Sequence, residues 1–589
     1  MENIKSYLSK AVRQVISELY GSEAVPQSID WQLTRKEFEG DLTLVVFPYT
    51  RYSKKSPEAT GAEIGEKLLS EVISDFNVVK GFLNLKIADT QLLQDFNSLF
   101  SADSLVEKLE QPVGVMVEYS SPNTNKPLHL GHVRNCLLGW AVGNIQQAVG
   151  NRVTRVQIIN DRGIHICKSM LAWQRFGNGE TPESTGMKGD HLVGKYYVIF
   201  DQAYRKEIAE LKDQGLSEEQ AKDEAPLMVA AREMLKQWEN GDAEVFQLWE
   251  MMNEWVYAGF NETYQRMGVS FDKNYYESDT YKLGKSLVDV GISKDIFQRD
   301  SDGSVWIDLT DIGLDRKLLL RRDGTSVYMT QDMGTAVQRF EDYDIDRLIY
   351  TVGNEQDYHF QVLFAILKKM GYQWADGLFH LSYGMVDLPS GKMKSREGNV
   401  VDADDLITAM ELGAQEMTES LGKADGMEPT ERTDLYRQIG LGALKYFILK
   451  VDPKKRMTFN PEESIDLQGN TGPFIQYTYA RIQSLLRKAG EIKSLEISSE
   501  ILHEERELIK QILRYSEVVH HAARENSPAL IANYTFDLVK MYNGYYQNHS
   551  ILRNDDASVT AWRLRLSSLV ARIIRDALAL LGIESPNKM

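Results

Sequence analysis

The sequence predicts a multi-domain α/β protein with a Rossmann-like domain at its centre. Strand-like and helix-like segments alternate in residues 114–176 and again in residues 346–388. Such alternation is typical of a parallel sheet whose ligands bind at the carboxyl ends of the strands. From about residue 406 to the end the pattern is almost wholly helical, which predicts an all-α bundle.

Three domains are therefore expected. A small α+β domain should occupy residues 1–112, and the Rossmann-like parallel-sheet domain should occupy residues 113–405. Residues from about 175 to 275 interrupt the alternation with charge-dense helical stretches, which indicates a helical insertion in that domain. The helical bundle should occupy residues 406–589.

The composition excludes several classes of protein. Of the 589 residues, 43% are hydrophobic and 26% are charged, so wholesale disorder and fibrous folds are excluded. No run approaches the ~18 consecutive apolar residues of a membrane helix, and no membrane partner is expected. Cys136 and Cys167 are too few for a disulfide framework or a Cys-rich zinc site. The N-terminal helix carries Glu2 and Glu18 and does not resemble a leader, which favours a cytoplasmic protein.

The charge of the chain is unevenly distributed. The formal net charge of −18 argues against a protein that coats nucleic acid without selectivity, because phosphate binding depends on Lys and Arg. Residues 451–589, however, contain 18 basic and 17 acidic residues. A nearly neutral C-terminal region on an acidic body permits a selective nucleic-acid partner.

The N-terminal domain is predicted from its hydrophobic pattern. Residues 1–21 should form an amphipathic helix, and an alternating stretch follows near residues 39–48. An Ala/Glu/Leu-rich helix is expected at residues 58–72 and a short strand at residues 81–87. Residues 102–112 are predicted to form a helix that ends near a proline, which marks the domain boundary.

The central domain begins with a β-branched apolar run at residues 113–120, which is typical of a buried parallel strand. Turn-forming residues follow, and a long helix is expected at about residues 131–148. A second strand and helix should occupy residues 152–160 and 162–176. After the insertion the predicted elements are a strand at 346–353, a helix at 360–371 and a strand at 379–388.

The strongest local motif is His129-Leu130-Gly131-His132, which follows a predicted strand and begins a predicted helix. Backbone N–H groups and the partial positive charge at a helix N-terminus attract phosphate. Two imidazoles there can donate hydrogen bonds to a phosphoryl group, and Gly131 would let a flat base approach the backbone. For these four residues taken alone, two ordinary histidines remain the alternative.

The second motif is a basic loop bounded by glycines, far downstream of the first. It consists of Lys392, Met393, Lys394, Ser395 and Arg396. Three cations and a hydroxyl on such a loop suit the pyrophosphate end of a nucleotide, although solvated basic loops are common. The chain has no G-x-G-x-x-G and no Walker A motif. Nucleotide binding by the two motifs together is therefore the favoured interpretation.

The two motifs resemble the HIGH and KMSKS motifs of class I aminoacyl-tRNA synthetases. Around the first, VEYSSPNTNKPLHLGHVRN is similar to the form found in arginyl-tRNA synthetases. Later segments are similar too, namely YMTQD, VGNEQDYHFQ, GKMKSREGNVV, DLQGNTGPFIQYTYARI and LLGIES. The matches keep their order along the chain, and the resemblance implies that the three predicted domains are an additional tRNA-binding domain, a catalytic domain and an anticodon-binding domain.

The resemblance implies an arginine pocket at the carboxyl ends of the strands. The guanidinium of arginine is planar, permanently charged and rich in donors, so its pocket needs carboxylates and other acceptors. The residues that match the family's pocket are Glu118, Asn123, Tyr328, Asp332 and Gln356. Two carboxylates, an aromatic wall and amides suit arginine and should reject lysine and citrulline.

The resemblance also implies a two-step reaction that uses ATP and Mg²⁺. The carboxylate of L-arginine attacks the α-phosphate of ATP, pyrophosphate leaves, and the arginyl group passes to the terminal ribose of the arginine tRNA. No protein nucleophile is needed, so positioning and charge stabilisation would account for catalysis. The implied catalytic residues are His129, Gly131, His132, Lys392, Lys394, Ser395 and Arg396, and the implied ATP contacts are Gly353, Glu355, Met385 and Val386. A structural metal is not expected.

The basic loop departs from the family pattern. The general motif is Lys-Met-Ser-Lys-Ser, whereas here Lys394 is third and Ser395 is fourth. The sequence leaves open whether Lys392 or Lys394 binds the pyrophosphate. Members of the family need bound tRNA before they activate the amino acid and are commonly monomers, and the resemblance implies both properties here.

Aromatic side chains of the C-terminal region have two interpretations. Tyr477, Tyr479 and the tyrosines of residues 541–546, together with Arg481, offer surfaces on which unstacked RNA bases could stack. Tyrosines at helical spacing also commonly fill a core. The sequence alone does not decide between the two.

Three other functions compete with this interpretation. They are a class I synthetase for another amino acid, a catalytically dead RNA-binding paralogue, and a small adenylyltransferase with the same histidine motif. An editing synthetase would need a large β-rich insertion, and a zinc-dependent one would need more cysteines. A dead paralogue would lose the histidines or the basic loop, and a small adenylyltransferase would not need the long helical region.

Overall fold

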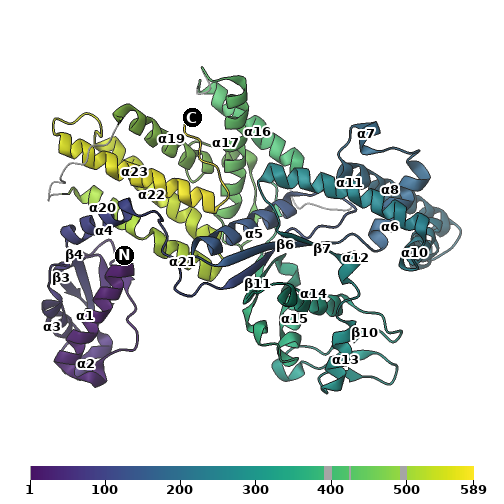
Figure 1. Cartoon of the computed structure of the whole chain (residues 1–589), viewed down its shortest axis with the longest axis horizontal. Helices are drawn as coiled ribbons and strands as arrows, with labels where there is room; N and C mark the ends of the chain where they lie inside the picture. The colour runs from purple at the N-terminus through teal and green to yellow at the C-terminus, as the bar shows by residue number, and fades with distance from the viewer. Residues whose placement is uncertain (1, 390–400, 423–425, 491–500) are drawn as a thin grey trace.

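The computed structural model describes residues 2–389, 401–422, 426–490 and 501–589. It has an N-terminal α+β unit, a central parallel-sheet domain with a helical insertion, and a helical domain (Figure 1), which confirms the predicted fold class. The N-terminal unit and the insertion lie toward opposite ends of the molecule, and the helical domain packs beside the sheet. The predicted basic-loop residues Lys392, Lys394, Ser395 and Arg396 lie outside the described residues.

The N-terminal unit is built on an antiparallel sheet of strand order β1-β2-β4-β3. Its core side is apolar because Leu83, Leu85 and Ile87 alternate along β4 and are all buried. Helix α1 packs its apolar residues against the same core. The elements are α1 (Glu2–Tyr20), η1 (Ser22–Ala24), β1 (Gln32–Leu33), β2 (Leu42–Val45), α2 (Phe47–Ser53), α3 (Pro57–Leu68), β3 (Ile73–Val79), β4 (Phe82–Ile87) and α4 (Asp89–Ser101).

The helix predicted at residues 102–112 is wrong. These residues follow α4 and form no helix, because their backbone groups are bonded to other parts of the chain. The carbonyls of Ala102 and Asp103 accept hydrogen bonds from Arg572 at 2.5 and 2.9 Å. The N–H of Leu109 donates to the carbonyl of Val149 at 2.8 Å. The segment therefore connects the N-terminal unit to the rest of the molecule as an irregular chain.

The central sheet has the strand order β12-β11-β5-β6-β7, and all its pairings are parallel. Strand β5 is buried at every residue, as its apolar run predicts. The predicted strands and helices on either side are confirmed, except that the strand predicted at residues 379–388 ends at Tyr383, and residues 386–387 pair with residues 457–458 in a separate two-stranded sheet. The elements are β5 (Gly114–Glu118), α5 (Leu130–Ala148), β6 (Arg152–Ile159), α6 (Ile164–Phe176), β7 (Lys273–Tyr276), β11 (Arg347–Gly353), η3 (Asn354–Gln356), α15 (Asp357–Lys369), η4 (Gln373–Gly377) and β12 (Leu378–Tyr383).

Two groups of elements are inserted in this alternation. The predicted helical insertion packs α8 and α11 on α6. A second group carries a small antiparallel sheet of order β10-β9-β8. The elements are α7 (Pro182–Thr185), α8 (Gly189–Asp213), α9 (Glu218–Glu224), α10 (Pro226–Glu239) and α11 (Ala243–Met267), then α12 (Glu277–Thr280), α13 (Lys285–Ser293), β8 (Gln298–Arg299), β9 (Val305–Ile307), η2 (Thr310–Ile312), β10 (Lys317–Leu320) and α14 (Tyr328–Asp342).

The helical domain contacts both other parts. Short strand β13 pairs in parallel with β14, which joins the end of the sheet domain to the start of the helices. The elements are β13 (Val386–Asp387), α16 (Ala403–Ser420), α17 (Pro429–Leu449), β14 (Met457–Thr458), α18 (Pro461–Ser464), α19 (Gly472–Ala489), α20 (His503–Leu513), α21 (Tyr515–Glu525), α22 (Pro528–Asn548) and α23 (Ala557–Leu580). None of the helices in the described ranges has the length and apolar character needed to cross a membrane.

Helix α5 links the sheet to the helical domain. Gly139 lets it lie close to β5, because a Cβ at this position would overlap the side chain of Tyr119. Near its other end, Nε2 of Gln146 donates to the carbonyl of Ala523 at 2.7 Å and to Oδ1 of Asn526 at 2.8 Å. The helix therefore spans from the edge of the sheet to α21.

Candidate active site

The two imidazoles of the histidine motif are held by backbone hydrogen bonds at the start of α5. Nδ1 of His129 accepts from the N–H of Gly131, and Nδ1 of His132 accepts from the N–H of His129, both at 3.1 Å. The ring centroids are 3.9 Å apart. Because Nδ1 is an acceptor in each ring, the proton of the neutral imidazole lies on Nε2, which can donate to a ligand.

Both imidazoles are neutral at physiological pH. Burial and the charge of Lys126 together lower the pKa of His129 to about 4. Burial, His129 and Lys126 hold the pKa of His132 well below its ordinary value. A Cβ at Gly131 would lie 2.9 Å from Cε1 of His129, so the ring position itself requires glycine. The motif therefore offers hydrogen-bond donors and a helix N-terminus to an anion.

The chain that follows the predicted basic loop lies directly beside this motif. The N–H of Leu130 donates to the carbonyl of Val401 at 3.1 Å, and the N–H of Ala403 donates to the carbonyl of Leu128 at 3.0 Å. His129 and Asp402 form an antiparallel bridge. Residues 401–403 are thus fixed against the histidine motif, although they are remote from it in sequence.

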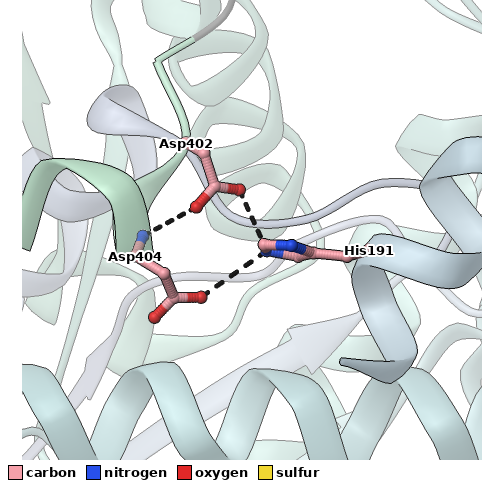
Figure 2. Close-up of side chains that lie close together, drawn as sticks. All are labelled: His191, Asp402 and Asp404. Carbon is pink, nitrogen blue, oxygen red and sulfur yellow. Dashed lines mark hydrogen bonds and ion pairs between the residues drawn. The ribbon is translucent and has the colours of Figure 1, made fainter. Parts of the chain in front are cut away.

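Figure 2 shows that His191, a side chain of the insertion, points toward Asp402 and Asp404. Nε2 of His191, on α8, lies 3.2 Å from Oδ2 of Asp402 and 3.6 Å from Oδ2 of Asp404. Lys188 and Arg266 also form ion pairs with Asp404, at 2.5 and 3.3 Å. Hydrogen bonds to the two carboxylates raise the pKa of His191 to about 10. The ligand atoms are close enough to hold a metal ion, but three protein cations already balance the carboxylates.

A cavity of about 180 Å³ lies at the carboxyl ends of β5 and β11. Three of the five predicted arginine-pocket residues line it, namely Glu118, Asp332 and Gln356. Glu118 is the last residue of β5, and Asp332 lies on α14. Its remaining lining residues are Ile158, Thr335, Arg339, Tyr350, Val352, His359, Phe360 and Leu363.

The other two predicted pocket residues do not line this cavity. Tyr328 is the first residue of α14, one turn before Asp332 on the same face, and its side chain is 75% exposed. Asn123 is exposed in the turn after β5, where it forms a parallel bridge with Asn160. Both lie near strand or helix ends at the same edge of the sheet.

Each cavity carboxylate is paired with a basic side chain that the sequence analysis missed. Arg339, on α14, forms an ion pair with Glu118 and is 1% exposed. Nε2 of His359, on α15, lies 2.6 Å from Oδ2 of Asp332. Pairing of residues so far apart in sequence leaves no local signal.

The predicted ATP contacts lie at the ends of β11 and β12. Gly353 ends β11, and Glu355 is exposed in η3. Met385 is 49% exposed, whereas Val386 is 3% exposed, so any contact of Val386 with a nucleotide would come from its backbone. The buried guanidinium of Arg134 donates to the carbonyls of Gly384 and Met385 at 2.7 and 3.2 Å and fixes this edge.

Comparison with known proteins decides the family. Residues 95–460 match the sequence model described as tRNA synthetases class I (R), catalytic domain, and residues 475–589 match the DALR anticodon binding domain. An arginine–tRNA ligase of Bacteroides thetaiotaomicron is 57% identical, and one of Flavobacterium psychrophilum is 56% identical, each over 100% of both chains. The chain belongs to the class I arginyl-tRNA synthetase family.

The fold agrees with a solved member of this family. The Thermus thermophilus arginyl-tRNA synthetase has a TM-score of 0.81 at 24% identity, with 99% of this chain and 100% of that chain covered. Family membership also answers the alternatives left open above. Members of class I use ATP for catalysis, and the histidine motif matches a catalytic domain rather than a small adenylyltransferase.

Glu277 and Lys126 are two further residues that the sequence analysis missed. Burial and the charges of Asp161 and Asp332 raise the pKa of Glu277 to about 7, against the opposing charge of Arg162. Burial lowers the pKa of Lys126, whose charge acts on both imidazoles. Lys126 lies inside the quoted motif segment, so its type and position were visible in the sequence, whereas Glu277 gave no signal.

The aromatic residues of the helical domain divide between the two interpretations. Tyr479, Tyr542 and Tyr545 are buried and belong to the core. The guanidinium of Arg481 lies over the rings of Tyr477 and Tyr546, 5.0 and 5.3 Å from their centroids. These two tyrosines are half-buried.

Proposed function

We propose that the chain ligates L-arginine to its cognate tRNA through an arginyl-adenylate, with release of AMP and pyrophosphate. The observation that carries the proposal is the cavity at the carboxyl ends of β5 and β11, which is lined by Glu118 and Asp332 and lies at the sheet edge where α5 also begins. The relatives of this chain are arginine–tRNA ligases along their whole length. Two carboxylates at the edge where helix α5 presents its phosphate-attracting N-terminus suit a cationic amino acid and ATP.

The cavity selects a cation through its carboxylates. Asp332 and the nearby Glu277 would receive the guanidinium, whose charge favours the ionised form of Glu277. Glu118 and Gln356 would hold the other polar groups of arginine, and Tyr328 and Asn123 would close over it. A lysine ammonium offers fewer donors in a different geometry, so it would leave acceptors of the cavity unpaired.

Activation requires no protein nucleophile. The Nε2–H groups of His129 and His132 and the N-terminus of α5 stabilise charge at the α-phosphate as the arginine carboxylate attacks it. The predicted pyrophosphate ligands are Lys392, Lys394, Ser395 and Arg396, and the nucleoside contacts are Gly353, Glu355, Met385 and Val386. Mg²⁺ would enter with the ATP phosphates, whose oxygens are its preferred ligands.

We expect the three predicted domains to have different roles in binding and charging tRNA. Residues 1–112 would bind the tRNA as an additional domain, residues 113–405 would carry the chemistry, and residues 406–589 would bind the anticodon. Tyr477, Arg481 and Tyr546 offer a stack of rings and guanidinium to an unstacked base. We propose a monomer in the cytoplasm, where the two buried cysteines would stay reduced.

ATP–pyrophosphate exchange, run with each amino acid in the presence and absence of tRNA, tests the proposal. We expect exchange with arginine only, with strong stimulation by arginine tRNA. Transfer of labelled arginine to that tRNA tests the second step, and His129→Asn is the matched inactive control. Exchange with a different amino acid, or none under any condition, would refute the assignment.

A further inference from the structure

The Glu118–Arg339 pair has an unusual environment for a buried ion pair. Arg339 and Glu118 are buried, and Arg339 reaches Oε2 of Glu118 through Nη1. Among the residues that the structure describes, Nε and Nη2 of Arg339 have no hydrogen-bond partner. Its guanidinium lies over the rings of Tyr275 and Tyr350, 5.2 and 5.7 Å from their centroids. Two aromatic rings and one carboxylate therefore hold the cation in place.

The pair leaves one oxygen of Glu118 directed to other partners. From the described part of the chain, Oε1 receives only a long hydrogen bond of 3.3 Å from the hydroxyl of Ser121. Glu118 and Arg339 both line the cavity. One oxygen is thus fixed by the protein, and the other is available to a donor in the cavity.

We propose that Arg339 is a positioning residue that holds one oxygen of Glu118 and directs the second oxygen to the amino-acid substrate. The inference rests on the proposed function, because it assumes that the cavity receives arginine. A buried carboxylate is costly unless a cation compensates its charge. Arg339 does so through Oε2 of Glu118, and this bond also fixes the direction of Oε1.

Four full-length variants test the inference. Arg339→Met removes the cation but keeps a similar volume, and Arg339→Lys keeps the charge without the planar fork. Glu118→Gln and the double variant Glu118→Gln/Arg339→Met complete a cycle. Arg506→Met is the matched control, because Arg506 forms a buried pair with Asp41 far along the chain from the cavity. The readouts are kcat and the KM values for arginine and ATP in aminoacylation, with thermal stability measured in parallel.

We expect Arg339→Met to raise the KM for arginine by roughly 10- to 100-fold with little change in the KM for ATP. The reason is that Glu118 would no longer be held in place for its charge-assisted hydrogen bond with the substrate. Arg339→Lys should recover part of this loss. The double variant should be no worse for arginine than Glu118→Gln alone, because Arg339 acts through Glu118. Arg506→Met should lower stability without changing the KM for arginine.

The inference is wrong if Arg339→Met leaves the KM for arginine unchanged, or if the double variant shows the sum of the two single effects. Equal increases in both KM values, with a stability loss like that of Arg506→Met, would also overturn it. Should Arg339→Met not fold, Arg339→Lys decides the question, and an unchanged KM for arginine in that variant would overturn the inference. A wild-type protein that does not attach arginine to tRNA would instead refute the proposed function.

Discussion

The Glu118–Arg339 pair can be compared with the Asp41–Arg506 pair between the N-terminal unit and the helical domain. Asp41 accepts two hydrogen bonds from Arg506, at 2.8 and 2.6 Å, and one from Lys510 at 2.8 Å. A backbone N–H, that of Ile87, supplies a further bond at 2.8 Å. Every oxygen of this carboxylate is occupied by the protein.

The cavity pair is chemically similar but incompletely bonded. Arg339 contacts one oxygen of Glu118 and retains two nitrogens without partners among the described residues. A buried polar group without a partner costs free energy, which a ligand or bound water can recover. The fully bonded Asp41–Arg506 pair thus joins two parts of the chain, whereas the incompletely bonded Glu118–Arg339 pair beside a cavity indicates a binding site for a ligand.

The largest expected effect concerns the cavity. Asp332→Asn should raise the KM for arginine by roughly 100-fold, because a neutral amide cannot form an ion pair with a guanidinium. The KM for ATP should change little. Glu118→Gln should have an effect in the same direction. Steady-state aminoacylation with each substrate varied in turn measures both values. Equal changes for arginine and ATP would remove these residues from the pocket.

The next effect concerns the interface pair. Asp41→Asn should destabilise the protein by about 3 kcal/mol, because two buried cations lose their partner. Burial opposes the charge of Asp41, but Arg506 and Lys510 outweigh it and lower its pKa. This stability is therefore present above the ordinary pKa of aspartate and is lost as the pH falls through the lowered value. Urea unfolding at several pH values tests this, and an altered KM for arginine would contradict the comparison.

A smaller effect is expected at the cluster in Figure 2. The pKa of His191 is raised from 6.5 to about 10, so its contribution is complete below pH 6.5 and is lost as the pH rises through about 10. The side chain is 31% exposed, so solvent screening reduces the contribution to about 1 kcal/mol. His191→Gln should thus be less stable than the wild type at pH 6, with the difference vanishing above pH 10. A difference that grows with pH would have the wrong sign.

The smallest effect is expected at an exposed pair. Arg152 and Asp344 lie 3.1 Å apart, and both side chains are largely in solvent. Such pairs contribute little, because water screens the charges and the side chains lose freedom. Arg152→Ala should change neither the unfolding midpoint in urea nor the KM values. A measurable loss of stability would show that hydrogen bonding alone does not determine how much the Glu118–Arg339, Asp41–Arg506 and Arg152–Asp344 pairs stabilise the protein.

Local pattern was sufficient to predict most elements of the central domain. The apolar run of β5 and the start of α5 at the histidine motif follow from propensity and turn chemistry. The helix predicted at residues 102–112 was wrong, because the backbone of this segment is hydrogen-bonded to distant groups such as Arg572 and not within a helix. Local sequence cannot show a competitor that lies in another domain.

The candidate site was predicted only in part. Glu118, Asp332 and Gln356 were expected from the resemblance to arginyl-tRNA synthetases, and all three line one cavity. Their partners Arg339 and His359 were missed, because charge pairing between α14, α15 and the sheet has no sequence signature. The resemblance therefore identified carboxylates of the cavity, whereas the side chains that pair with them are brought there by the three-dimensional fold.

Helix α5 has a mechanical consequence. It is about 28 Å long, with an imidazole pair at one end and Gln146 bonded to α21 near the other. A helix resists stretching along its axis, so its two ends cannot be displaced independently. Any rearrangement that shifts Ala523 and Asn526 must either carry His129 with it or break the bonds of Gln146.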